Sequence, residues 1–507
     1  MLINALIGKK YYMRNQLTIR KYSYYLFVVY ACTVVLSILA AIFFESPAPI
    51  ALPIILAVAF QVIVDYEKIF FLLFLCIPIS TEVFISGHLA TDLPTEPLIV
   101  GLMLIYCLVV ITKPLSINPK YVKHPLSILL LAHIGWMALT TFTSSSFGFS
   151  VKFLLAKLWY IVTFFFLTGY IVKSEKKIDF LLWLVLVPLT IATTKVILHH
   201  ATLDFGFKQI NASCPPFFRN HVNYAAILSV FLPFLWYLRK WSSTIIQRRI
   251  SEIGFVIICF GIITAYTRAA YVAVVLALAA YWVIRLRLVR LAIIIASLVI
   301  FGVLSFLITG NRFLELVPTD QTVAHTELSD IVSSTSELKD VSTMERYYRW
   351  IAGTQMIVEK PVLGFGPGNF YHFYKHYTLD RFSTYVSDNP EKSGIHNYYL
   401  MTALEQGLLG LLIFLAIVYY TIIYGEHVYH ESASRKRKDL VMATILSTII
   451  IDAFLLMNDM IETDKIGSFF FFNIAIIVII DLLNRNEIDV TLANRLSTEQ
   501  EQPASKQ

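Results

Sequence analysis

The chain has 507 residues, of which 57% are hydrophobic and 15% are charged, and its formal net charge is +7. A soluble protein of this length could not bury so much apolar surface, so a soluble enzyme or a nucleic-acid-binding protein is excluded. The positive charge is explained by its position along the chain, because Lys and Arg concentrate in the termini and in alternate connections, such as Lys176-Lys177 and Arg248-Arg249. This is the positive-inside bias of membrane proteins. It predicts that both termini are cytoplasmic.

Apolar segments of about the length that spans a bilayer alternate with short polar connections. The third segment is short, and the stretch 251–285 is too long for one span, with Thr267-Arg268 at its turn. We therefore predict an all-α, polytopic membrane protein with about 12–14 transmembrane helices. The apolar segments are 24–43, 48–65, 68–80, 97–112, 126–144, 151–171, 178–198, 222–238, 251–267, 269–285, 291–309, 397–424, 440–457 and 467–483.

The predicted spans divide into regions. Residues 1–265 hold N-terminal helices, 266–425 form a core around an outer loop at 310–396, and 426–484 hold C-terminal helices. The cytoplasmic tail, 485–507, is polar, and its composition predicts disorder beyond Leu496. The five Cys residues show no metal-ligand spacing, and four lie inside predicted spans, so we expect no disulfide.

The outer loop has two parts of different composition. Its first part, 318–343, is rich in Ser, Thr, Asp and Glu, which is typical of a flexible or lightly structured lid. In its second part, MERYYRWIAGTQMIVEKP predicts an amphipathic helix ended by Pro361. GFGPGNF at 364–370 predicts a tight turn, and the aromatic run FYHFYKHY follows. A simple connection between two spans could be far shorter, so this loop is a candidate working element. The candidate apolar positions of its helix are Tyr348, Ile351, Met356 and Ile357.

Basic side chains on the predicted outer face are candidates for function. Arg268 lies at the edge of a span, where a charge is costly unless it is paired or functional; the alternative is a snorkelling Arg at the interface. Arg346 and Arg349 lie one turn apart on the loop helix, and the alternative is a surface pair with Glu345 as local partner. Arg219 ends the second-longest outer loop beside His221, and its alternative is an interfacial anchor.

His396-Asn397 stands where the outer loop re-enters the membrane. The positive end of the helix dipole disfavours an imidazolium there. A neutral imidazole can accept a proton, as a general base must; the alternative is a histidine that caps the helix. Glu405 comes nine residues later, about half a turn around the helix, so we expect it to pair with another span.

These candidates together favour a phosphate ligand. Arg219, Arg268, Arg346 and His396 map to the outer face, whereas the sequence shows no metal-ligand cluster, P-loop or carboxylate dyad there. Arg binds phosphate through charge-assisted, often bidentate hydrogen bonds. A base beside a diphosphate site on the outer face of a membrane protein suggests transfer from a lipid diphosphate to a hydroxyl.

The segment from about Tyr266 to Gly410 resembles the O-antigen ligase and O-antigen polymerase superfamily. The resemblance rests on a Thr-Arg pair that opens a span, an Arg-x-x-x-Trp motif, a glycine-rich turn and a closing His-Asn-x-x-Leu…Glu-x-Gly-x-x-Gly motif. The family's usual Gly-Asn-Pro-Asn is absent upstream, where this chain has RNHVNYAA. The residues that carry the resemblance are Thr267, Arg268, Arg346, Trp350, Pro361, Gly364, Gly366, Gly368, Asn369, Phe370, His396, Asn397, Leu400, Glu405, Gly407 and Gly410.

The resemblance implies a metal-independent, inverting glycosyltransferase with a GT-C-like membrane architecture and no cofactor. Its donor would be a glycan on undecaprenyl diphosphate or another polyprenyl diphosphate, at the periplasmic face of the bacterial inner membrane. Arg268 and Arg346 would bind the diphosphate, and His396 would deprotonate the acceptor hydroxyl. Arg219, Arg349, Asn397 and His221 would contact substrate, and the aromatic run would stack on sugars or, as we favour, form an interfacial belt.

Three acceptors are compatible with this chemistry. A ligase, which we take as the leading interpretation, transfers O-antigen to lipid A-core in lipopolysaccharide biosynthesis. A polymerase extends another lipid-linked repeat of O-antigen or exopolysaccharide, and a third branch glycosylates Ser or Thr of proteins. A transporter of anionic lipids is the main alternative of another class. It predicts inverted repeats, and the sequence shows no such symmetry.

Overall fold

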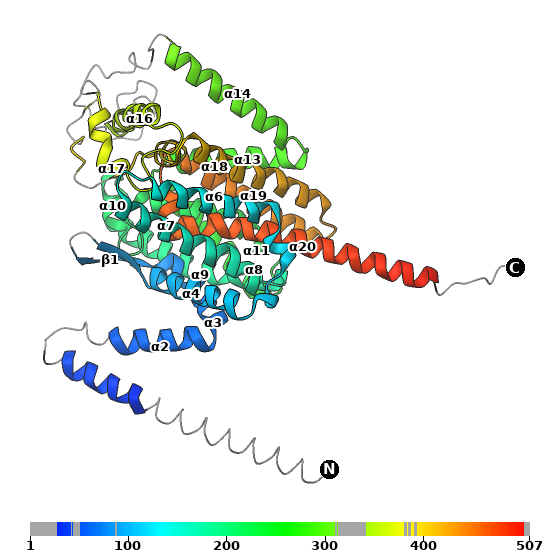
Figure 1. The fold of residues 1–507 in the computed structure, drawn as a ribbon. Coiled ribbons are helices and arrows are strands. Elements are labelled where there is room, and N and C mark those ends of the chain that lie inside the picture. The colour runs from blue at the N-terminus through cyan, green and yellow to red at the C-terminus, as the bar shows by residue number, and fades with distance from the viewer. Residues whose placement is uncertain are drawn as a thin grey trace. The chain divides into compact units, whose positions relative to one another are not determined.

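The computed structural model describes residues 28–41, 43, 51–86, 89–309, 312, 341–379, 383, 387–389 and 393–500 (Figure 1). The segment 313–340, which includes most of the predicted lid at 318–343, lies outside these residues. The chain divides into two compact units, Met1–Phe70 and Phe71–Gln507. The first unit contains a helix at Val28–Ala41, α2 (Ala51–Val64) and the beginning of α3 (Tyr66–Cys76).

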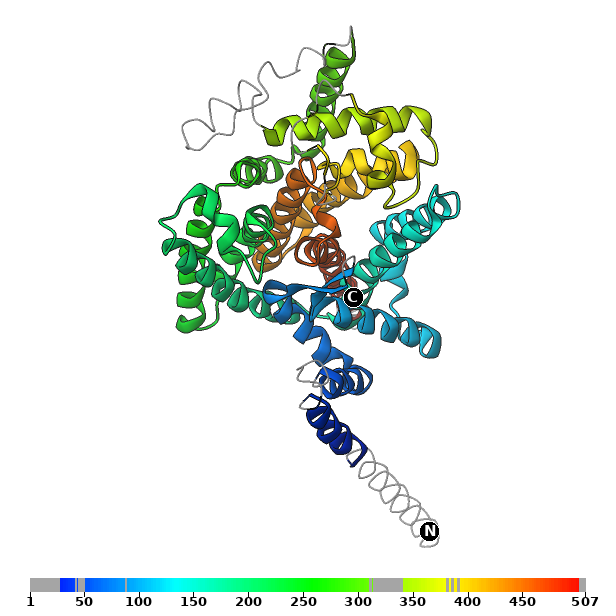
Figure 2. The ribbon, with the colours of Figure 1, turned by 90° about the vertical axis from the view of Figure 1, so that its left-hand side faces the viewer.

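The second unit is a bundle of helices with one short sheet. In Figure 2 the last helices of the chain lie in the middle of this unit, with the helices of the green segment on one side and the cyan helices on the other. Its longer elements are β1 (Thr81–Ser86), β2 (Leu89–Leu93), α4 (Thr95–Thr112), α6 (Pro125–Phe142), α7 (Phe147–Ile161), α9 (Glu175–Ala201), α11 (His221–Lys240), α12 (Ile245–Thr264), α13 (Arg268–Arg285), α14 (Val289–Ile308), α16 (Val341–Glu359), α18 (Tyr398–Glu431), α19 (Arg435–Leu455) and α20 (Asp464–Gln500). Short pieces connect them: η2 (Ile77–Ile79), η3 (Pro114–Ser116), α5 (Pro119–Val122), the π-helical η4 (Val162–Leu167), α8 (Thr168–Ile171), η5 (Phe207–Gln209), α10 (Ile210–Ser213), α17 (Phe370–Phe373), η7 (Tyr374–Tyr377) and η9 (Met460–Glu462).

The all-α, polytopic fold is confirmed. Each of the fourteen predicted apolar segments coincides with a helix within the described part of the chain. By length and composition, eight helices there could cross a membrane, and Val28–Ala41 and Val289–Val303 are shorter apolar helices. The other segments form helices that are shorter or carry more charge; α19, for example, begins with RKRKD.

α20 forms the centre of the second unit. Its side chains Phe469, Phe470, Phe471 and Phe472 are all buried, although four consecutive residues point in all directions around a helix. A helix that is apolar on every side is stable only when neighbours surround it. The helix continues to Gln500. The prediction of disorder beyond Leu496 is therefore wrong for residues 497–500.

The β1–β2 hairpin was not predicted. Its two strands are antiparallel, with Thr81 opposite Leu93, Glu82 opposite Asp92 and Val83 opposite Thr91. The strands occupy the polar connection between two apolar segments. The alternation of apolar and polar residues is too short there to distinguish a strand from a loop.

Connections that the charge pattern assigns to one side of the membrane contact each other. Arg437 pairs with Glu175, and Lys436 pairs with Asp179, on the side predicted to be cytoplasmic. On the opposite side, the backbone N–H of Ser145 donates to the carbonyl of Phe365, at 2.9 Å. The assignment of each side to a compartment stays a prediction.

α18 is interrupted at Gly407, whose φ is +71° and ψ 177°. The break leaves helical backbone groups available, and residues 361–366 bond to them. Phe365 N–H donates to the Leu404 carbonyl at 2.9 Å, Gly366 N–H to the Glu405 carbonyl at 2.8 Å, and Leu408 N–H to the Pro361 carbonyl at 2.8 Å. The outer loop is thereby joined to α18 by backbone hydrogen bonds.

The glycine-rich turn is fixed from two further directions. The predicted tight turn is present, with positive φ at Gly364, Gly366 and Gly368. Asn369 Nδ2 donates to Ser144 Oγ at 2.7 Å. The buried Glu405 carboxylate accepts hydrogen bonds from the backbone N–H groups of Gly368 and Phe370. Glu405 therefore binds the outer loop, and the expectation that it pairs with another span is wrong.

Replacing Gly407 by Ala should destabilise the protein by more than about 2 kcal/mol. A backbone with positive φ and ψ near 180° is essentially restricted to glycine and costs a residue with a Cβ atom roughly 1–3 kcal/mol, and this Cβ would also overlap the Val362 carbonyl. Thermal unfolding in detergent measures the effect. Gly135→Ala in α6 is the matched control, because a Cβ atom there meets open space. Equal melting temperatures for the two variants would contradict the account of the break.

Candidate functional site

The segment 393–397 connects the outer loop to α18 and carries His396. The φ angle of His396 is +57°, in the left-handed region that residues with a Cβ atom rarely adopt. Such a conformation persists only where the surroundings fix it, and it is concentrated at functional sites. Contacts from α16 and from the segment after α19 fix it here.

α16 holds the segment on one side. The helix is amphipathic as predicted, with a buried stripe four residues apart along one face. Of the predicted apolar positions, Tyr348 and Met356 are buried and Ile351 and Ile357 are half-buried; Met344 and Ala352 complete the stripe. Two side chains from this helix reach the backbone before His396. Arg349 Nη1 donates to the Gly394 carbonyl at 3.0 Å, and Trp350 Nε1 donates to the Ile395 carbonyl at 3.1 Å.

Asp459 holds the segment on the other side. It lies between α19 and η9, and its Oδ2 accepts a hydrogen bond from the backbone N–H of His396 at 3.3 Å. Asn397 N–H also donates to this carboxylate, whose pKa burial raises to about 6. A Cβ atom at Gly394 would overlap Asp459 Oδ2. A side chain at this position would therefore displace the Asp459 carboxylate from the backbone of His396.

The His396 ring is hydrogen-bonded to the Asn458 side chain. Within the described residues, Asn458 Nδ2 has no hydrogen-bond partner, so the bond uses Asn458 Oδ1, which can only accept. One ring nitrogen of His396 therefore donates to Asn458. In a neutral imidazole the other nitrogen then carries a lone pair and can accept a proton.

His396 is neutral over most of the pH range. Burial, together with the positive charges of Arg349 and Arg346, lowers the pKa of its imidazole to about 4, and the hydrogen bond to Asn458 opposes this shift. The prediction of a neutral imidazole from the helix dipole has the right direction. The main physical cause is burial beside two guanidinium groups.

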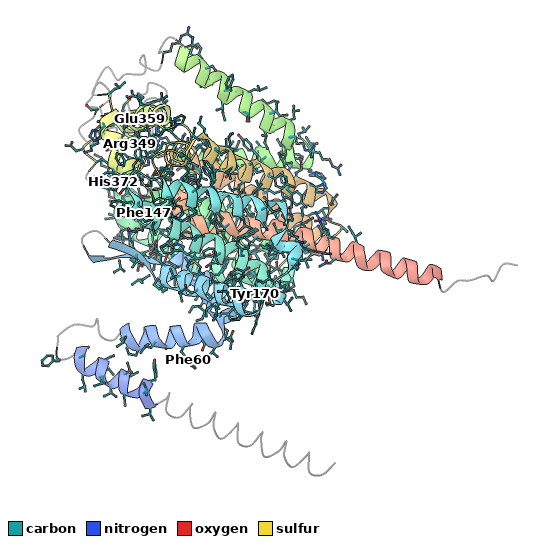
Figure 3. The ribbon with its side chains drawn as sticks, viewed as in Figure 1. Phe60, Phe147, Tyr170, Arg349, Glu359 and His372 are labelled. Atoms are coloured by element: carbon teal, nitrogen blue, oxygen red, sulfur yellow. The ribbon has the colours of Figure 1, made fainter. Side chains whose placement is uncertain are left out.

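The two arginines of α16 have different surroundings. Arg349 is buried and pairs with Glu345, four residues earlier, at 3.3 Å, so its guanidinium is used to hold the segment before His396. Arg346 is half-buried, and its charge reaches the imidazole. The structure thus brings Arg346, Arg349 and His396 near one another, and Figure 3 labels Arg349.

The other predicted residues lie around the same face. Arg268 is the first residue of α13, beside the start of α11, where Thr267 Oγ1 donates to the His221 carbonyl at 3.4 Å. The ring of His221 contacts Asn211 Oδ1 at 2.7 Å. Arg219 is largely exposed and faces Glu82, with 3.8 Å between the charged atoms. A cavity shared by Arg268, Arg346 and His396 stays a prediction.

Asn397 caps α18, because its Oδ1 accepts the Leu400 N–H at 2.9 Å. Such a cap contributes about 1 kcal/mol. Its predicted contact with substrate stays a prediction. The aromatic run contributes to the interior of the outer loop, since Phe370 and Tyr374 are buried and stacked with ring centroids 4.8 Å apart.

Lys157 of α7 is a residue that sequence reasoning missed. It is buried, and its Nζ donates to Glu462 Oε1 at 2.6 Å and to the Tyr398 hydroxyl at 3.0 Å. A charge inside the apolar segment 151–171 is itself a signal, because such residues are usually paired or functional. Asn458 and Asp459 carry no comparable local signal, since their partner lies more than sixty residues away.

The fold and this site define an all-α, polytopic membrane protein with a histidine and arginines beside one span. Residues 253–415 match the family described as O-Antigen ligase. The match covers the segment that carries the motifs, and in this segment the chain resembles the O-antigen ligase superfamily, as the motifs indicated. The match supports a glycan ligase or polymerase function and a lipid-linked glycan substrate in a membrane. The matched segment contains Arg268, Arg346, Arg349, His396 and Asn397. Arg219 and His221 precede this segment. No curated protein matches the chain.

Replacing Arg346 by Gln should raise the pKa of His396 from about 4 toward the ordinary value, because a positive charge that disfavours the imidazolium is removed. NMR titration of histidine labelled with ¹⁵N measures this pKa, and the spectrum of His396→Gln assigns the signal. Lys375→Gln is the control, since this lysine is an exposed residue of the same loop. A pKa that stays the same in Arg346→Gln would show that this charge does not act on the imidazole.

Proposed function

We propose that the protein transfers a glycan from a polyprenyl-diphosphate carrier to an acceptor hydroxyl, with inversion at the anomeric carbon and without a metal ion. The observation that carries this proposal is a neutral imidazole, oriented by Asn458 and Asp459, beside the guanidinium of Arg346. A proton acceptor and a cation in one place suit a reaction in which a hydroxyl loses a proton while a diphosphate gains charge.

The acceptor oxygen attacks the anomeric carbon as the bond from that carbon to the diphosphate oxygen breaks. The free ring nitrogen of His396 takes the hydroxyl proton, and the polyprenyl diphosphate leaves with the bonding electron pair. Arg346 and Arg268 stabilise the charge that develops on the leaving oxygen. Arg349 acts through the segment that it holds, so we assign it to positioning. The bound diphosphate also partly cancels the field of Arg346, which raises the pKa of His396 and makes it a stronger base.

We propose lipid A-core as the acceptor, with undecaprenyl diphosphate as the carrier and the periplasmic face of the bacterial inner membrane as the site of transfer. The charge distribution supports this orientation, because it predicts cytoplasmic termini and a periplasmic outer loop. Polymerisation of lipid-linked repeats and transfer to proteins use the same donor chemistry.

Deleting the gene should distinguish the acceptors. For the proposed ligase, the cells should make lipopolysaccharide that ends at the bare core and should accumulate lipid-linked polymer. Gel electrophoresis of lipopolysaccharide, with extraction of the carrier lipid, measures both. Core that carries a single repeat would instead indicate a polymerase. An unchanged lipopolysaccharide ladder would contradict both the ligase and the polymerase hypothesis.

Replacing His396 by Ala should abolish turnover and leave donor binding nearly unchanged. A general base contributes about 10²- to 10⁴-fold through proton transfer in the transition state, and it makes no ionic bond with the bound diphosphate. Arg346→Ala should weaken donor binding as well, because it removes a charge from the phosphate site. Purified protein in lipid, with a defined polyprenyl-diphosphate donor, allows both quantities to be measured.

The control for this pair is His376→Ala, which removes an exposed histidine from the same loop and should retain full activity. If His396→Ala lost donor affinity as severely as Arg346→Ala and kept its turnover at saturating donor, His396 would be a phosphate ligand. The base would then have to be another residue, with His221 the first candidate.

A further inference from the structure

A cavity of about 530 Å³ lies at the β1–β2 hairpin. The β1–β2 hairpin, the beginning of α4, residues 215–219 and the segment 462–466 form its walls. These segments all belong to the side of the bundle that carries His396. The proposed function assigns this cavity no role.

The lining of the cavity is strongly acidic. Five carboxylates line it, from Glu82, Asp92, Glu96, Glu462 and Asp464, against two basic side chains, Arg219 and Lys465. Asp464 and Lys465 are buried and bond to each other and to the hydroxyl of Ser80. Their charges therefore cancel locally, and the excess of negative charge belongs to the hairpin and to α4.

The hairpin places two carboxylates directly opposite each other. Glu82 and Asp92 are cross-strand partners, and like charges in this position destabilise a sheet. Burial, with Asp464 nearby, raises the pKa of Asp92 to about 7. Arg219 is exposed and 3.8 Å from Glu82, a geometry that contributes little stability. The arrangement costs folding free energy, which is typical of a site that serves a ligand.

The cavity adjoins the segment that carries the imidazole. Glu462 lines it and pairs with Lys157, and Lys157 in turn donates to the hydroxyl of Tyr398, the second residue after His396. The cavity is therefore linked to the segment that carries His396 through the Lys157–Glu462 pair and the Tyr398 side chain. A diphosphate would be repelled there by the carboxylates and attracted to Arg346.

We propose that this cavity binds the phosphate-free, hydroxyl-rich end of the acceptor glycan. This inference rests on the proposed transfer reaction and names the subsite of its second substrate. The carboxylates of Glu82, Asp92 and Glu96 accept hydrogen bonds from sugar hydroxyls or from the ammonium of an amino sugar. The two substrates are then sorted by charge, with the donor diphosphate at the arginines and the acceptor glycan at the acidic cavity.

The double variant E82Q/D92N tests the subsite. Measured above the pKa of Asp92, its affinity for core oligosaccharide released by mild acid from the organism's lipopolysaccharide should fall roughly fivefold or more, because hydrogen bonds to charged acceptors become bonds to neutral ones. Its affinity for polyprenyl diphosphate should not change. Saturation-transfer NMR on protein in nanodiscs measures both dissociation constants. Asp388→Asn, which removes an exposed carboxylate from the outer loop, is the matched control and should bind both ligands like the wild type.

The double variant should be at least as stable as the wild type, since it removes repulsion between opposed carboxylates; a thermal melt checks this. The proposal is overturned if the oligosaccharide binds the double variant as tightly as the wild type, if the wild type does not bind it, or if donor affinity falls instead. These titrations need no turnover. A failure of the transfer reaction would appear in the activity of the wild type and is therefore distinguishable from a failure of the subsite.

Discussion

The backbone break at Gly407 is the constraint on which the arrangement of the outer loop depends. A continuous helix would use its own carbonyl groups at Leu404 and Glu405, and the segment 361–366 would have nothing to bond. With the break, these groups pair with the loop, and the Glu405 side chain adds a contact to the glycine-rich turn. Buried backbone groups must be paired, so the break and the loop stabilise each other. The chain is thereby fixed on both sides of His396.

The site uses charge in two opposite ways. Around His396, burial and the arginines of α16 keep the imidazole neutral. In the wall of the acidic cavity, the hairpin and α4 place three carboxylates against the exposed side chain of Arg219. Each group favours a different partner, an anion in the first case and hydroxyl or ammonium groups in the second. The Lys157–Glu462 ion pair connects the basic group around His396 with the acidic group at the hairpin. Because opposite charges interact strongly inside a protein, this neutral pair keeps the two groups from cancelling each other.

Local patterns in the sequence predicted the helices, the amphipathic face of α16, the glycine turn and the neutrality of His396. The first three depend on hydropathy period and on residues that permit positive φ. The neutrality of His396 was predicted from a helix terminus, whereas its main cause is burial beside Arg349 and Arg346. The partner of Glu405 could not be found this way, because the count of nine residues assumed a helix that includes His396. That residue is left-handed, and α18 begins at Tyr398. Asn458, Asp459 and the hairpin depend on contacts between distant segments, which a single sequence does not reveal.

A structure of the protein with a bound polyprenyl-diphosphate glycan would test the central claim most directly. The account predicts that the diphosphate oxygens lie within about 3 Å of the Arg346 guanidinium. The free nitrogen of His396 should be within hydrogen-bond reach of the place from which an acceptor hydroxyl attacks the anomeric carbon, about 3 Å away. A diphosphate held by other basic residues, with the imidazole out of reach of the anomeric carbon, would contradict the assignment of His396 as the base.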